Sequence, residues 1–194
     1  MTIFYLIRHG QHDRLPGDQP LNAAGRRQAA RTATFLATQH IDAVYTSPLS
    51  RARETGEIIA SEIGLPLEVD ERLRERANFG DLPGQTFQEF LEMWRRCDED
   101  RTLEPRTGLS AQANGERMQE WLLETHQVVP CARVVTCTHG ATITDLLLNR
   151  YRESALERLH PGFREQFGNC SLTVLSVDEG GFTLQTLAST DHLA

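Results

Sequence analysis

Ile3-Phe4-Tyr5-Leu6-Ile7-Arg8-His9-Gly10 is a short apolar stretch that ends in a polar turn. A second stretch of this kind, Val134-Val135-Thr136-Cys137-Thr138-His139-Gly140, lies far along the chain. Both are rich in β-branched or aromatic residues, which is typical of buried strands in a parallel sheet. Ligands of open α/β sheets bind beyond the carboxyl ends of the strands. If the two strands are neighbours, two imidazoles and an arginine meet at one edge, where they suit an anion.

The rest of the chain alternates between strand-like and helix-like patterns, which favours βα units. We expect an α/β fold of three α/β/α layers, with a mostly parallel central sheet flanked by helices. It forms a single domain, residues 1–194, with a small helical cap insertion at about 76–130. Strands are expected at residues 3–8, 43–45, 66–69, 133–138, 172–177 and 182–187. Helices are expected at residues 23–38, 48–63, 85–97, 115–128, 141–150 and 153–159.

Capping and turn residues set several of these boundaries. Asn22 is a suitable N-cap for the first helix, and Gly64 is a suitable stop for the second. Ser47-Pro48 predicts a helix start, with the serine as N-cap and the proline at the first helical position. A polar stretch predicts a loop over 100–114. The residues at 178–181 predict a hairpin turn at the edge of the sheet.

Composition narrows the possible functions. The chain has 194 residues and a formal net charge of -7, which does not support non-specific nucleic-acid binding. No apolar stretch approaches the roughly 20 residues of a membrane-spanning helix, and the N-terminus lacks the basic start of a signal peptide. We therefore expect a cytoplasmic protein with no membrane partner.

None of the four cysteines forms a Cys-x-x-Cys pair, so no structural zinc is expected. The sequence shows no exposed apolar stripe, and it does not indicate the oligomeric state.

The two His-Gly turns suggest different roles for their histidines. A neutral histidine is able to attack phosphorus and form a covalent intermediate, and Arg8 beside His9 is suited to bind two phosphate oxygens. His139 precedes a predicted helix whose free N–H groups favour anions, so it is placed to stabilise phosphoryl oxygens. Taken alone, each turn fits better a strand-end histidine that bonds backbone carbonyls, because the motif is short.

Two more residues extend the candidate site. Arg51 falls in the first helical turn after the strand at 43–45, so it is able to reach the same sheet edge. Arg53 faces elsewhere on a helix and is interpreted as solvated or paired with a glutamate. A phosphate ester leaves as an alkoxide and needs a proton donor, which Glu75 would supply. Taken alone, Glu75 among neighbouring arginines is typical of a surface ion pair.

Together these elements resemble the histidine phosphatase superfamily, in its branch 1, the phosphoglycerate-mutase-like type. The resemblance is strong over residues 1–84 and 132–146 and weak elsewhere. It rests on Arg8-His9-Gly10, on Ser47-Pro48-Leu49-Ser50-Arg51-Ala52 with Thr55, on Leu73-Arg74-Glu75 and on Thr138-His139-Gly140.

The resemblance implies a nucleophile, a proton donor and a set of phosphate-binding groups. His9 would become phosphohistidine, and Glu75 would give a proton to the leaving group and then take one from the attacking water. No metal or cofactor is expected, because phosphoryl transfer depends mainly on positioning and charge stabilisation. The expected phosphate or substrate contacts are the side chains of Arg8, Gln11, Arg51 and His139 and the backbone N–H groups of Gly140 and Ala141.

Two departures from the family pattern bear on the substrate. The stretch Gln11-His12-Asp13-Arg14 lacks an asparagine that many members carry shortly after Arg-His-Gly. Leu82-Pro83 replaces the tryptophan and its neighbour in a Gly-x-Trp-x-Gly motif. The resemblance places that loop against the substrate, so an unusual specificity is expected.

Several side chains keep two interpretations. One set forms an apolar substrate wall or packs the cap helix onto the domain: Phe79, Phe87, Phe90 and Trp94. A second set holds another anionic group of the substrate or, as is usual for charged loop residues, is solvated: Arg95, Arg96, Arg101 and Arg106. His9, His12 and His139 also form a candidate metal-ligand set, but nearby arginines repel a divalent cation, so no metal is expected.

We therefore predict a phosphatase that hydrolyses a small phosphorylated metabolite, a phosphomonoester, through phosphohistidine on His9. The first alternative is a mutase, which uses the same residues. The family's mutases usually carry a longer insertion that shields the phosphoenzyme from water, whereas residues 76–130 are a short segment. The second alternative is a non-catalytic regulatory protein that binds a phosphorylated ligand on the same fold. The sequence does not identify the substrate.

Overall fold

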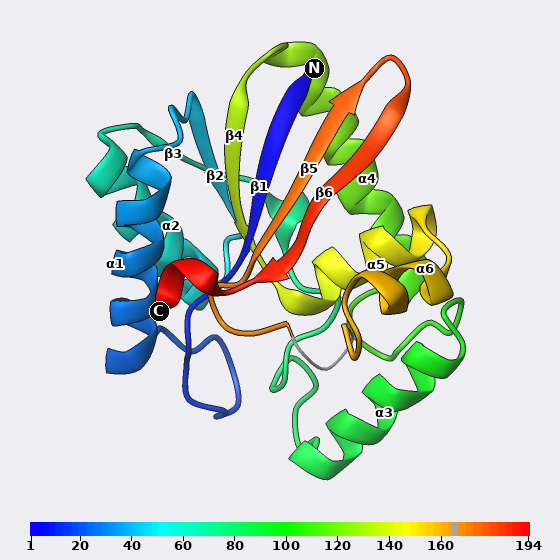
Figure 1. Ribbon diagram of the computed structural model, residues 1–194. Helices are drawn as coiled ribbons and strands as arrows, with labels where there is room; N and C mark the ends of the chain where they lie inside the picture. Colours follow the sequence, from blue (N-terminus) through cyan, green and yellow to red (C-terminus); the bar gives the residue numbers. More distant parts are fainter. Residues whose placement is uncertain (164–166) are drawn as a thin grey trace.

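One sheet lies at the centre of the protein, with the strand order β3-β2-β4-β1-β5-β6 (Figure 1). The computed structural model describes residues 1–163 and 167–194. Within these ranges the strands are β1 (Thr2–Arg8), β2 (Ala43–Thr46), β3 (Leu67–Val69), β4 (Arg133–Thr138), β5 (Leu172–Asp178) and β6 (Gly181–Ser189). The first four strands pair in parallel, whereas β5 pairs antiparallel with both β1 and β6. The expected mostly parallel sheet and its edge hairpin are confirmed.

Helices cover both faces of this sheet and complete three layers. α1 (Ala23–Ala37) and α2 (Ser50–Ile63) lie on one face (Figure 1). α4 (Ala111–Val128), α5 (Gly140–Arg150) and α6 (Glu153–Leu159) lie on the other face. In the part of the chain that the structure describes, no helix is long and apolar enough to cross a membrane.

β1 shows how the sequence pattern builds this core. Phe4 and Leu6 are fully buried on the side of α4 and α5, whereas Tyr5 and Ile7 are buried on the side of α1 and α2. Successive strand residues point to opposite faces, so a continuous apolar run is suited to a strand that is covered on both sides. Each such side chain contributes roughly 1.5–3 kcal/mol to folding.

The pairing of β1 with β4 brings the two His-Gly turns together. In the parallel register Ile7 lies opposite Cys137, and Arg8 lies opposite Thr138. Both strands therefore end at the same level, and the backbone N–H of His9 donates to the Thr138 carbonyl at 3.0 Å.

The second helix begins at Ser50, so the prediction of Ser47 as its N-cap, with Pro48 at the first helical position, is wrong. The backbone N–H of Ser50 donates instead to Asp18 Oδ1 at 2.8 Å. Ser47 Oγ lies 2.8 Å from Nε2 of His139. A carboxylate from a distant loop thus caps the helix, and the serine contacts His139 at the edge of the sheet. Gly64 ends α2 with a φ of 78°, as expected.

Two other helices differ in their starting points from the prediction. α3 (Phe87–Glu99) begins with a capping box between Thr86 and Glu89, two residues later than expected. α4 begins at Ala111, because Ser110 accepts a hydrogen bond from the backbone N–H of Ala113. The predicted loop over 100–114 therefore ends at Ser110.

The expected cap segment at 76–130 has two different surroundings. α4 packs into the layer over the sheet, and its Met118, Trp121 and Leu122 are buried in the core. α3 lies beyond the carboxyl ends of the parallel strands (Figure 1) and has Cys97 as its one fully buried residue. α3 and its flanking loops thus lie over the edge where His9 stands.

The loop after His9 approaches α1 so closely that Gly25 has no room for a side chain. A Cβ at Gly25 would lie 2.0 Å from the carbonyl oxygen of Gln11. We expect Gly25→Ala to lower the free energy of unfolding by about 1–3 kcal/mol, because overpacking exceeds the gain in helix propensity. Urea denaturation measures this change. Thr34→Ala, on the exposed side of α1, is the control, with a change within about 0.5 kcal/mol. Unchanged stability of Gly25→Ala would contradict this packing.

Candidate active site

His9 follows the last residue of β1 directly and is 4% exposed. Neighbouring elements hold its backbone: the carbonyl of His9 accepts from Asn169 Nδ2 at 3.1 Å, and the next N–H, of Gly10, donates to Thr55 Oγ1 at 3.0 Å. With the bond to Thr138 on β4, these contacts tie the turn to the sheet, to α2 and to the segment before β5. The position of the imidazole is therefore fixed by the backbone that carries it.

Hydrogen bonds also determine the tautomer of His9. Nδ1 lies 2.8 Å from the carbonyl oxygen of Gly10, which only accepts, so Nδ1 carries the proton. Nε2 faces the Nε–H of Arg51 at 3.2 Å and is the acceptor. Burial lowers the pKa of His9 well below its usual value, and the charges of Arg51 and Arg8 lower it further. The ring is thus neutral, with its lone pair on Nε2, as a nucleophile requires.

Two arginines flank this ring. Arg51 is 5% exposed, in the first turn of α2, and donates from Nη1 to Asn78 Oδ1 at 3.0 Å. Arg8 donates from Nη1 to the carbonyl of Phe167, whereas its buried Nε has no hydrogen-bond partner among the described residues. Burial lowers the pKa of both guanidinium groups, and the Glu75 carboxylate opposes that effect. Arginine stays charged at neutral pH, so the two side chains concentrate positive charge beside His9.

His139 is fully buried at the start of α5, with its ring centroid 5.2 Å from that of His9. Ser47 Oγ accepts from the backbone N–H of Leu49, so its own hydroxyl proton is available for Nε2 of His139. If Ser47 donates this proton to Nε2, Nδ1 of His139 carries the ring proton, and Nδ1 has no hydrogen-bond partner among the described residues. Burial lowers the pKa of His139 well below its usual value, as do Arg51 and His9. His139 is therefore a neutral N–H donor at this edge.

Glu75 comes from the segment between the 3-10 turn Glu71–Leu73 and α3. Its Oε1 accepts from Thr142 Oγ1 of α5 at 3.2 Å and from the backbone N–H of Arg76 at 3.1 Å. The segment is tied to the sheet edge because Thr138 Oγ1 donates to the Leu73 carbonyl at 2.7 Å. These contacts direct the carboxylate toward the space that His9 also lines.

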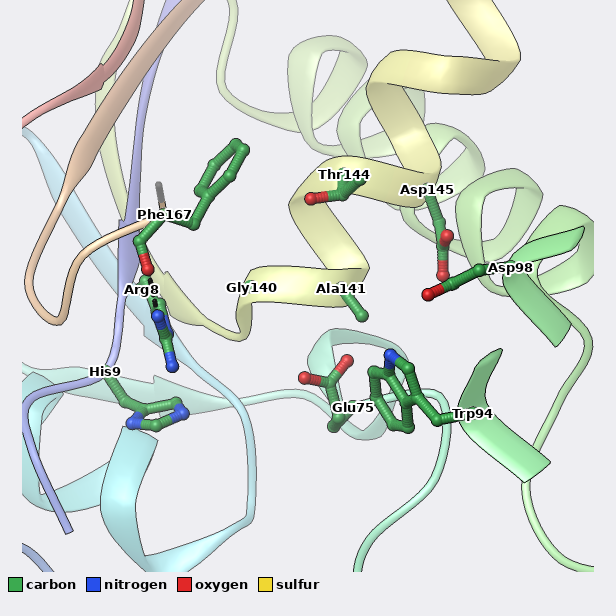
Figure 2. Close-up of a pocket in the computed structure, with 10 residues that line it drawn as sticks. All are labelled: Arg8, His9, Glu75, Trp94, Asp98, Gly140, Ala141, Thr144, Asp145 and Phe167. Carbon is green, nitrogen blue, oxygen red and sulfur yellow. Dashed lines mark hydrogen bonds between the residues drawn. The ribbon is translucent and has the colours of Figure 1, made fainter. Parts of the chain in front are cut away.

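Two adjoining cavities meet at these residues. The polar cavity, of about 220 Å³, is shown in Figure 2, where Glu75 lies between His9 and Trp94. Its lining includes Arg8, His9, Glu75, Trp94, Asp98, Gly140, Ala141, Thr144, Asp145 and Phe167. The aromatic cavity, of about 310 Å³, shares Arg8, His9, Glu75 and Trp94 with it and adds Arg51, Asn78 and the side chains of α3.

Most of the predicted site residues thus lie together at the two cavities. Gln11 and the loop with Leu82 and Pro83 do not. Arg8, His9, Arg51, Glu75, Gly140 and Ala141 line a cavity, and His139 packs beside His9. Gln11 is exposed and lines neither cavity; its backbone N–H donates to Gln28 Oε1 at 2.9 Å. Leu82 and Pro83 also line neither cavity.

Sequence reasoning missed several residues that support the site. Asn78 binds Arg51, and Ser47 binds His139, but a lone asparagine and a serine at an expected helix cap carry no signal for such distant contacts. The sequence indicates His12 only as a candidate metal ligand, yet its ring lies 5.2 Å from that of His9, and the residue lines the aromatic cavity. Among the described residues, no group of three or more His, Cys, Asp or Glu side chains is arranged to hold a metal ion.

Arg76 is the largest omission. It is 2% exposed and bridges Asp145 of α5, at 3.3 Å, and Asp98 of α3, at 2.5 Å. Its guanidinium carbon lies 4.0 Å from the centroid of the Trp94 ring. Burial alone lowers the pKa of Arg76, but the two carboxylates more than offset this, so the pKa lies above its usual value. This ion pair network fixes α3 over the sheet edge.

The four cap arginines differ in their surroundings. Arg95 is exposed and pairs with Glu92 and Glu99 along α3. Arg101 donates to Asp145 and Asn149 of α5 and so belongs to the same network as Arg76. Arg96 and Arg106 line a separate cavity between α3 and residues 103–107. None of the four lines the two cavities at His9.

These observations define a class of protein: an α/β domain whose sheet edge holds a neutral histidine among cationic and N–H donors, which suits phosphoryl transfer. The family model of the histidine phosphatase superfamily, branch 1, matches residues 4–190. The chain belongs to this family, as its sequence motifs indicate.

Individual relatives agree with this membership. An uncharacterized phosphatase, PhoE, of Bacillus subtilis is 33% identical over 76% of this chain and 76% of its own. Phosphoglycerate mutase-like protein 4 of Arabidopsis thaliana is 33% identical over 97% and 85%. A phosphoserine phosphatase mutant of Entamoeba histolytica, solved with phosphoserine, has a TM-score of 0.78 and 27% identity over both full chains. A mycobacterial glucosyl-3-phosphoglycerate phosphatase, solved with VO3, has a TM-score of 0.76 and 27% identity over 97% and 99%.

The protonation of the two buried histidines is directly measurable. We expect His9 and His139 to be neutral at pH 6, with the proton of each on Nδ1, in long-range ¹H–¹⁵N spectra. Because the unfolded chain protonates these histidines near pH 6.5 and the folded protein does not, stability falls as pH falls below about 6.5. His9→Gln and His139→Gln assign the signals. An Nε2-protonated His9, or a midpoint near 6.5 for either ring, would contradict the geometry.

Proposed function

We propose that this protein is a phosphatase that hydrolyses a small phosphomonoester through a phosphohistidine on His9. One observation carries the proposal: the neutral Nε2 of His9 faces Arg51 in a cavity that Arg8 and Glu75 also line. A nucleophile, phosphate-binding cations and a carboxyl group for proton transfer thus surround one space. Relatives that bear phosphatase names support the same activity.

In the first step, the lone pair on His9 Nε2 forms a bond to phosphorus, and the bond from phosphorus to the ester oxygen breaks. Glu75, in its protonated form, gives its proton to that oxygen, so the leaving group departs as a neutral alcohol. Arg8, Arg51 and the Nδ1–H of His139 bind the phosphoryl oxygens, whose negative charge they stabilise. The hydrogen bond from Nδ1 of His9 to the Gly10 carbonyl stabilises the phosphorylated ring.

In the second step, a water molecule attacks phosphorus from the side that the alcohol has left. The Glu75 carboxylate takes a proton from the water as its oxygen bonds to phosphorus, and the bond between phosphorus and Nε2 breaks. Inorganic phosphate leaves, and His9 and protonated Glu75 are restored. Two arginines and the His139 imidazole supply the charge stabilisation, so we propose that the reaction requires no metal or cofactor.

Mutase activity is the second candidate, because relatives with phosphoglycerate mutase names align over most of their length. A mutase must keep the phosphoenzyme from water and return the phosphoryl group to the substrate. Among the described residues, the expected insertion contributes one short helix, α3, to the cavities at His9. Incubation with a phosphoglycerate separates the two: free phosphate supports the phosphatase, and isomer without free phosphate contradicts it.

Replacement of Glu75 tests the proton-transfer role. We expect Glu75→Gln to lower kcat/KM about 10²- to 10⁴-fold for an alkyl phosphate, whose alkoxide needs a proton. The loss is much smaller for para-nitrophenyl phosphate, whose leaving group is stable without one. Glu71→Gln, an exposed carboxylate four residues earlier, is the matched control.

Equal losses for both substrates would contradict the role of Glu75. If the wild-type protein releases no phosphate from para-nitrophenyl phosphate at any pH from 4 to 8, the phosphatase proposal fails, and a non-catalytic binding protein becomes the better account.

A further inference from the structure

Four aromatic side chains form a continuous surface beside the nucleophile. The ring centroid of Phe79 lies 5.2 Å from that of Phe87 and 5.5 Å from that of Phe90. Phe90 in turn lies 5.5 Å from Trp94. These residues, which we call the aromatic wall, all line the aromatic cavity together with His9 and Arg51.

The aromatic wall is not part of the protein core. None of its four residues belongs to the buried clusters that pack the sheet against its helices. Phe87 is 38% exposed, and the adjacent cavity residue Leu91 is 45% exposed. Exposed large apolar side chains gathered at one cavity are typical of a ligand site. The wall therefore leaves its apolar area available to a molecule in the cavity.

The wall lines one of the two cavities that His9 shares, and this is the one that also contains Arg51. A phosphoryl group at His9 Nε2 and Arg51 would lie in this cavity, whose lining also includes Phe79, Phe87 and Phe90. The facing rim comes from the loop after His9, including Leu15. Among the described residues, Glu75 is the one carboxylate in the lining. The leaving group thus meets the aromatic wall on one part of the lining, and His12, Arg14 and Asn78 belong to the polar remainder.

The wall is also held in place. Arg76 lies over the Trp94 ring at 4.0 Å and joins α3 to α5 through Asp98 and Asp145. A wall fixed before binding loses less conformational freedom when a flat ring packs against it, which favours affinity. Contact between aromatic rings adds binding free energy beyond that of burying their apolar surface.

We propose that the aromatic cavity is a subsite for an aromatic leaving group, and that the natural substrate is a phosphomonoester of an aromatic or similarly flat apolar alcohol. This inference rests on the phosphatase function proposed above, because it identifies the cavity as the place of the departing alcohol. Polar three-carbon phosphates do not contact the aromatic wall and are therefore poorer substrates.

Binding of two phosphonates tests the subsite without any turnover. Phenylphosphonate and methylphosphonate carry the same anionic head, and only the first reaches the wall. We expect phenylphosphonate to bind about tenfold more tightly. Titration calorimetry measures both affinities. Fluorescence offers a second readout, because the chain has two tryptophans and Trp121 is buried in the core, so a change on binding reports Trp94.

Variants of the wall complete the test. Phe87→Ala and Leu91→Ala, both at exposed positions, reduce the preference for phenylphosphonate at least threefold. Leu123→Ala, an equally exposed apolar residue of α4 outside both cavities, retains the preference. The proposal is wrong if the two phosphonates bind equally, if neither binds, or if both wall variants weaken the two phosphonates by the same factor.

Hydrolysis distinguishes this proposal from the phosphatase function itself. Benzyl phosphate and propyl phosphate have alkoxide leaving groups of similar basicity, so their kcat/KM ratio reports binding of the ring. We expect benzyl phosphate to be favoured about tenfold. Equal rates overturn the subsite and leave the phosphatase intact. A clear preference in phosphonate binding with no hydrolysis of either ester overturns the phosphatase and leaves an aromatic phosphate-binding site.

Discussion

Parallel pairing of β1 with β4 is the constraint on which the site depends. It places Arg8 opposite Thr138, so His9 and His139, which are 130 positions apart in the chain, end two adjacent strands at the same level. A slip of one residue would turn every side chain of β1 to the other face and separate the two rings. In this register Phe4 and Leu6 pack on one helical layer, and Tyr5 and Ile7 pack on the other. Core packing and site geometry are therefore set by the same residues.

Burial gives these residues their chemical properties. Arg8, Arg51 and two imidazoles share a space that is largely removed from water, so the histidines stay neutral and the arginines stay charged. Buried cations and unpaired N–H donors are costly unless they are bonded or meet an anion. Asn78 and the Phe167 carbonyl satisfy part of the arginine donors, while Arg8 Nε and His139 Nδ1 have no hydrogen-bond partner among the described residues. The charges and donors at this edge thus suit a negatively charged group.

Most features of the fold and the site that depend on neighbouring residues could be predicted from the sequence. The alternation of β1, the Asn22 cap and the two His-Gly turns each identify an element from neighbouring residues, and the family motifs place Arg51 and Glu75. Contacts between residues that lie far apart in the chain could not be predicted in this way. Asp18 caps α2 in place of Ser47, and Ser47 contacts His139 across 92 positions. Arg76 looked like one of several arginines around Glu75, yet it is buried between two carboxylates from different helices. Gln11 follows the family pattern in sequence but stands outside the cavities.

The central claim is that Nε2 of His9 accepts the phosphoryl group during turnover. It is tested most directly by a rapid alkaline quench of the enzyme with its substrate, followed by peptide mass spectrometry and NMR of the modified residue. The account predicts a phosphoryl group on His9 alone, bonded to Nε2, because Nδ1 is held by the Gly10 carbonyl. Phosphate on His139 or His12, or attachment to Nδ1 of His9, would contradict it.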